Sequence, residues 1–192
     1  MELHTWMLND VADVRRRLQG VLDGVPTSEW KLPAPGDGPS LAHLALHLGR
    51  HHDLSVNTAI RNHPPLYLAH RGTLGLAAAP AWADLAEDED ATVIEALDLD
   101  ALVAYVDAVF DATTAWLDHL GSMVLDTVPD TADRLRDLAQ IPDELAWLTS
   151  MWSDRPVWWL LQWPVIGHGH AHVGQAGVVR NVLGHNPFGA KR

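Results

Sequence analysis

Apolar residues recur at spacings of three and four along four separate stretches, and this repeat restricts the fold more than any other feature. The stretches run from about Leu3 to Leu22, from Leu41 to Arg61 or Asn62, from about Leu102 to Leu120, and from about Val157 to Leu183. Such a period is typical of amphipathic α-helices, and no stretch alternates convincingly as a half-buried β-strand does. Four helices of about 20 residues each predict an all-α fold, a four-helix bundle.

Breaks in this pattern mark the connections. Ser40 follows a Pro- and Gly-rich link and is a predicted N-cap for the second helix. Residues 63–97 form a long connection with an acidic run, which we expect to be a solvated face and to cross the outside of the bundle or shape a pocket mouth. Short helices are predicted at Thr131–Leu138 and Glu144–Met151, and Pro164 is predicted to kink the last helix.

Composition limits the classes of function. A chain of 192 residues fits a single domain, residues 1–192, and its net charge of −12 argues against a nucleic-acid partner or an anionic membrane. No apolar run of about 18 residues predicts a membrane span, and Met1–Trp6 shows no signal peptide, so we expect a cytoplasmic protein. The chain has no cysteine, so any metal site must be built from His, Asp, Glu or water.

A histidine pair near the C-terminus is the strongest candidate for such a site. His168 and His172 are four residues apart, which places both imidazoles on one helical face within reach of one metal ion. His170 points elsewhere, so a third ligand must come from another helix. The second helix offers four candidates: His43, His47, His51 and His52.

These motifs resemble those of the DinB/YfiT-like metalloenzymes, and the resemblance covers nearly the whole chain. The matching segments, in chain order, are Ser40-Leu41-x-x-Leu44-x-x-His47-Leu48, a Trp-rich middle, His168-x-x-x-His172-x-Gly174-Gln175 and Val179-Arg180-x-x-Leu183-Gly184. The chain departs from the common pattern at Val173, where many members have Arg or another polar residue.

The resemblance implies a four-helix bundle with long crossover connections that binds one divalent metal through His47, His168 and His172. His51 stays open as an alternative to His47, because several histidines crowd this part of the second helix. Members of known activity use a low-molecular-weight thiol as cosubstrate, either as bacillithiol-dependent transferases or as mycothiol-dependent transferases and isomerases. The resemblance also favours a homodimer.

Three imidazoles on one divalent ion leave coordination positions open, which is typical of catalytic sites. Zinc, nickel and iron all suit imidazole ligands, and such an ion would activate a thiol or water against a small electrophilic substrate. Gln175 lies one turn beyond His172 and is a candidate hydrogen-bond partner for a ligand imidazole or the substrate, with Asp53 a weaker candidate. No Glu lies beside the histidine pair, so no general base is evident.

Other interpretations of the same residues remain. The chain is alternatively a bundle that binds metal without catalysis, or a dimerising interaction protein whose histidines bind nothing. The indoles of Trp158, Trp159 and Trp163 either wall an apolar pocket beside the metal or fill the core.

Overall fold

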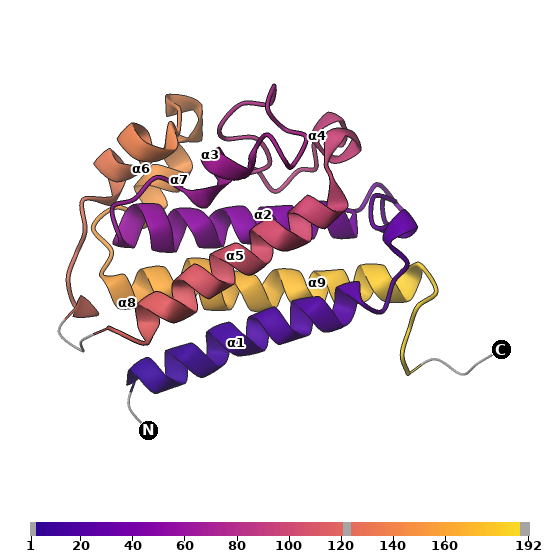
Figure 1. Ribbon diagram of the computed structural model, residues 1–192, viewed down its shortest axis with the longest axis horizontal. Helices are drawn as coiled ribbons and strands as arrows, with labels where there is room; N and C mark the ends of the chain where they lie inside the picture. The colour runs from indigo at the N-terminus through magenta and orange to yellow at the C-terminus, as the bar shows by residue number, and fades with distance from the viewer. Residues whose placement is uncertain (1–2, 121–123, 189–192) are drawn as a thin grey trace.

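The computed structural model describes residues 3–120 and 124–188, and within these ranges the chain is helical and forms no β-strand (Figure 1). The α-helices are α1 (Leu3–Leu22), α2 (Leu41–Asp53), α3 (Leu66–His70), α4 (Ala91–Ala96), α5 (Leu99–Leu117), α6 (Thr131–Ala139), α7 (Ala146–Trp152), α8 (Val157–Leu160) and α9 (His168–Val182). Two short 3₁₀ turns, Thr27–Glu29 and Asp143–Leu145, and two π-helical segments, Leu54–Ile60 and Leu161–Gly167, complete the helical structure. The all-α prediction is therefore confirmed.

The four longest helices pack against one another around the main core. Helix α1 contacts α5 and α9, and α2 contacts the same two helices from the other side. Figure 1 shows α2 and α9 side by side along the longest axis, with α5 crossing α2 at an angle. The buried stripe of α1 falls on the predicted positions: Met7, Val11, Val14, Leu18, Val21 and Leu22.

The second and fourth predicted helices each continue through a π-helical segment. Ser40 caps α2, because its hydroxyl oxygen accepts the backbone N–H of His43 at 3.1 Å. The chain then runs through Leu54–Ile60, close to the predicted end of this helix. In the last helix Pro164 lies inside the π-helical segment Leu161–Gly167, so the predicted kink takes the form of a wider turn that accommodates the missing N–H.

Helix α1 approaches α9 closely at Gly169. A Cβ atom on this glycine would lie 2.8 Å from Cγ1 of Val14, so only glycine permits this contact. Gly174 and Gly177 differ, since a Cβ atom on either would meet nothing within 4 Å.

A buried carboxylate joins α2 to the connection that follows it. Oxygen atoms of Asp53 accept hydrogen bonds from the side-chain amide of Asn57, the backbone N–H groups of Leu66 and Tyr67, and the hydroxyl of Tyr105, at 2.8 to 3.0 Å. Burial raises the pKa of Asp53, and these donors oppose that rise. The network fixes the start of α3 against α2 and α5.

The next part of this connection lies along α2, and we call residues 81–90 the strap. The buried guanidinium of Arg50 donates to the carbonyl oxygens of Ala81 and Ala83 at 2.6 and 2.5 Å, and stacks 3.4 Å above the ring of Tyr67. The connection crosses over the outside of the long helices, as predicted, and the strap runs beside α2 (Figure 1).

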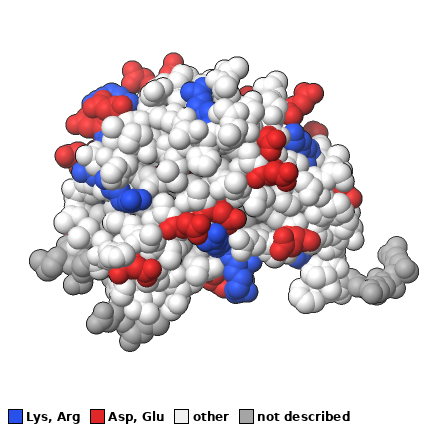
Figure 2. All heavy atoms as spheres, in the orientation of Figure 1, with Lys and Arg blue, Asp and Glu red and all other residues white. Residues whose placement is uncertain are grey.

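The surface agrees with the acidic composition. On the face shown in Figure 2, acidic side chains are scattered widely, with basic side chains close to many of them. Among the described residues, no helix is both long enough and apolar enough to span a membrane.

Candidate metal centre

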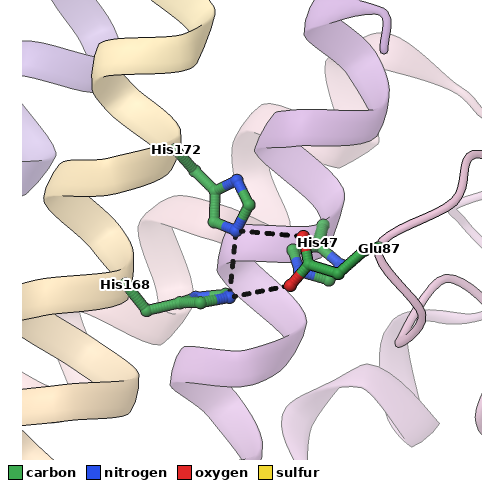
Figure 3. Close-up of side chains that lie close together, drawn as sticks. All are labelled: His47, Glu87, His168 and His172. Atoms are coloured by element: carbon green, nitrogen blue, oxygen red, sulfur yellow. Dashed lines mark hydrogen bonds and ion pairs between the residues drawn. The ribbon is translucent and has the colours of Figure 1, made fainter. Parts of the chain in front are cut away.

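Helices α2 and α9 bring three histidines together at one point between them. His47 lies in the middle of α2, while His168 and His172 occupy the first and second turns of α9. The backbone N–H of His168 bonds to the carbonyl of Trp163, five residues earlier, so the π-helical segment sets the register in which α9 begins. Figure 3 shows the three imidazoles pointing toward one another and Glu87 reaching them from the strap.

The ligand atoms of these four residues all lie within 4.8 Å of one another. Nε2 of His168 and Nε2 of His172 are 2.9 Å apart. The carboxylate oxygens of Glu87 lie 3.8 Å from Nε2 of His47, 3.9 Å from that of His168 and 4.0 Å from that of His172. The cluster could therefore hold one metal ion, with ligand types that suit zinc, nickel or iron.

Hydrogen bonds on the far side of two rings fix which nitrogen faces this point. Nδ1 of His47 donates to the carbonyl of Asp84 at 3.2 Å, and Nδ1 of His172 donates to the side-chain oxygen of Gln175 at 3.0 Å. A neutral imidazole with a protonated Nδ1 carries its lone pair on Nε2, so both rings present lone pairs to the centre. Nε2 of His47 is buried and has no hydrogen-bond partner within the described residues, as expected for an atom placed to bind a cation.

The surroundings keep two of these imidazoles, those of His47 and His168, neutral. Burial, together with the nearby imidazoles of His51, His168 and His172, lowers the pKa of His47 far below its usual value. Burial and the neighbouring rings also strongly lower the pKa of His168. Both side chains are therefore in the form that binds metals at neutral pH.

The other histidines of α2 have different partners. Nδ1 of His43 bonds to the buried carboxylate of Asp84 at 2.9 Å; burial opposes its protonation, but this contact outweighs burial and raises its pKa. Nε2 of His51 donates to the carbonyl of Leu85 at 3.1 Å, and Nε2 of His52 bonds to the hydroxyl of Thr113 at 2.8 Å. The cluster thus contains His47, whereas the alternative, His51, uses its Nε2 to hold the strap.

The two residues that were candidate hydrogen-bond partners of the ligand imidazoles, Gln175 and Asp53, lie in different places. Gln175, the candidate partner of a ligand imidazole or the substrate, bonds to His172 of the cluster. Asp53 belongs to the buried network with Tyr67 and Tyr105 and orients none of the histidines of the cluster.

The strap contributes two residues to the site, Glu87 and Asp84, that the sequence did not identify. Its acidic run was expected to be a solvated face, and the Glu87 side chain is indeed 71% exposed, yet its carboxylate faces the imidazoles. Asp84 is buried, and it positions His43 through its side chain and His47 through its backbone. The only sequence feature that pointed to these two residues was the length of the irregular connection, because such connections often shape the mouth of a pocket.

The tryptophans divide between the surface and the core. Trp158 and Trp163 are exposed, so these two indoles do not fill the core. The buried indole near the cluster is Trp152, whose ring centroid lies 6.0 Å from that of His51.

His52 allows a test of how burial affects acid stability. Burial lowers its pKa to about 3, so in the folded protein it stays neutral as the pH falls from 6.5 toward 3, while in the unfolded chain it gains a proton. Because of His52, the free energy of unfolding therefore falls by about 2 kcal/mol when the pH is lowered from 7 to 5. In His52→Leu, we expect the fall in the free energy of unfolding between pH 7 and pH 5 to be smaller by about 2 kcal/mol than in the wild type. In His63→Gln, at an exposed position, we expect this fall to equal that of the wild type. Urea unfolding at the two pH values, with a chelator present, measures it.

Comparisons with known proteins support the fold and leave the function open. No protein-family model matches the chain, and no curated protein matches it. A solved structure of a conserved protein from Enterococcus faecalis is similar, with a TM-score of 0.67 and 18% sequence identity over 95% of this chain and 97% of that one. At this identity, the likeness shows a shared helical fold.

Proposed function

We propose that this chain is a metal-dependent enzyme of the DinB/YfiT type, built as a four-helix bundle of α1, α2, α5 and α9. One divalent metal is held by His47, His168 and His172. The observation that carries the proposal is the convergence of three Nε2 atoms, one of them buried without a partner, at a single point. The ring of contacts among the four long helices and the matched histidine motifs support the assignment.

The chemistry follows from the donor set. A divalent ion on three neutral imidazoles supplies a Lewis acid that favours the deprotonated form of a thiol or water at neutral pH. The protein orients the imidazole of His47 through Asp84 and that of His172 through Gln175, and burial keeps His47 and His168 unprotonated. The proposed reaction is transfer of a thiol to a small electrophile, or hydrolysis of that electrophile, and we propose that a low-molecular-weight thiol is the cosubstrate.

One observation favours a second candidate function. Glu87 adds a fourth protein ligand to the group, and four protein ligands would complete the tetrahedral set of a structural zinc site. In that case the chain binds metal without catalysis.

Metal content and thiol consumption together test the proposal. Untagged protein, purified without a nickel column and incubated with zinc, nickel or iron, is expected to contain about one ion per chain by elemental analysis. The loaded protein should consume a simple thiol in the presence of a generic aromatic electrophile faster than protein stripped by a chelator. One ion per chain without faster loss of the electrophile, either to the thiol or to water, would favour the non-catalytic metal site, and no bound ion at all would remove the proposed function.

A further inference from the structure

The strap holds Glu87 between two anchored stretches of backbone. On one side, the carbonyl oxygens of Ala83, Asp84 and Leu85 accept hydrogen bonds from Arg50, His47 and His51 of α2. On the other side, the carboxylate of Glu89 accepts the backbone N–H of Ser40 at 2.6 Å. Residues 86–88 lie between these anchors and are exposed, so Glu87 is kept near the centre by a short stretch of chain.

The Glu87 carboxylate has no other partner among the described residues. Its oxygen atoms lie 3.8 to 4.0 Å from the Nε2 atoms of the three imidazoles of the cluster, and its side chain is 71% exposed. These separations exceed a metal–ligand bond length of about 2 Å but place the oxygens within a small side-chain rotation of a shared ion. Solvent can reach the same side of the centre, because the side chain that covers it is itself exposed.

We propose that Glu87 is an exchangeable fourth ligand, which binds the metal at rest and leaves when an external anion takes its position. This inference rests on the proposed function, because it requires the metal held by the three histidines. With a metal bound, the exchange would break one bond between a Glu87 oxygen and the ion and form one bond to the incoming anion, and the carboxylate would turn into solvent with its charge retained.

The charge balance identifies the class of ligand that can enter. Glu87 is the one residue of the cluster with an acidic side chain, and an imidazole that binds a metal does so in its neutral form, so the carboxylate is the only anion that the four residues bring to the ion. A monoanion such as a thiolate can replace the carboxylate without changing the net charge of the centre, whereas a neutral molecule would leave one more positive charge on it. The site therefore favours ligands that arrive as anions.

The histidines outside the cluster gain a role from this arrangement. His43 bonds to the side chain of Asp84 and His51 to the carbonyl of Leu85, so both act as positioning residues that hold the strap while His47 serves the metal. This division explains why α2 carries three histidines at a spacing of four residues although only His47 belongs to the cluster.

Cobalt-loaded protein tests the exchange, with Glu87→Ala as the variant and Asp88→Ala as the matched control. Asp88 is the next residue of the strap and is also exposed, so its replacement removes the same charge without removing a candidate ligand. The readouts are the Kd of cobalt by chelator competition, the visible absorption of the bound ion, and the Kd of azide for the loaded protein.

We expect Glu87→Ala to weaken cobalt binding by roughly 10- to 100-fold and to change the visible spectrum, while Asp88→Ala matches the wild type. Azide should bind Glu87→Ala roughly tenfold more tightly, because in the wild type the carboxylate occupies its position most of the time. If both variants match the wild type in cobalt and azide affinity, the exchange is wrong although the histidine site stands. If the wild type binds no cobalt, the histidine site itself is wrong and this inference with it.

Discussion

His47→Ala is expected to lower the metal content from about one ion per chain to less than about a tenth, because two imidazoles from one helix and the exchangeable carboxylate of Glu87 hold a divalent ion poorly. Nε2 of His47 is buried and has no hydrogen-bond partner among the described residues, and α2 contributes no other residue to the group. The same loss is expected for His172→Ala, which removes one nitrogen of the 2.9 Å pair. Elemental analysis of untagged protein after incubation with zinc measures both.

His51→Gln is the control for that experiment. A glutamine side-chain amide can still donate to the carbonyl of Leu85, so the strap stays anchored and the metal content should remain at about one ion per chain. Circular dichroism should show the same helical content in all three variants. Retention of metal in His47→Ala together with its loss in His51→Gln would place His51 in the site instead.

Asp53→Ala is expected to lower the free energy of unfolding by about 4 kcal/mol, a larger effect on stability than we expect from any change in the cluster. The substitution removes the acceptor of four hydrogen bonds: the buried ones from Asn57, Tyr67 and Tyr105, and the partly buried one from Leu66. Each donor left without a partner inside the protein costs free energy, because it was bonded to water in the unfolded chain. Urea unfolding at pH 7, followed by circular dichroism, measures the change.

Two further variants test the cause. Asp53→Asn keeps one carbonyl oxygen for the bonds from Asn57 and Leu66 but turns an amide toward the N–H of Tyr67, so an intermediate loss of about 2 kcal/mol is expected. Asp88→Ala, at an exposed position, should stay within about 0.5 kcal/mol of the wild type. If Asp53→Ala is as stable as Asp88→Ala, the buried network contributes nothing to folding.

The helices could be predicted from the sequence because their apolar stripes are local signals. The predicted bounds of the first helix, about Leu3 to Leu22, match α1, and the short helices predicted at Thr131–Leu138 and Glu144–Met151 correspond closely to α6 and α7. The spacing of His168 and His172 placed both rings on one face, and their Nε2 atoms do meet. Each of these features depends on residues close together in the chain.

The rest of the site depends on contacts between distant residues, which no local pattern encodes. His43, His47 and His51 share one edge of α2, so spacing alone could not distinguish the ring that faces α9 from the rings that face the strap. The path of the strap is set by the buried guanidinium of Arg50, more than 30 residues before it in the sequence. Glu87 could therefore be placed only once the fold was known.

The direction in which α9 presents its histidines depends on the length of the π-helical segment Leu161–Gly167. An α-helix turns by about 100° per residue, so the loss of one residue there would rotate His168 and His172 away from α2 by about that angle. Every ligand would still be present in such a sequence, but the ligands would no longer meet. When related chains are aligned, the number of residues between Pro164 and His168 is thus as informative about the metal site as the histidines themselves. We expect a chain with a one-residue deletion between these two positions to lack the site.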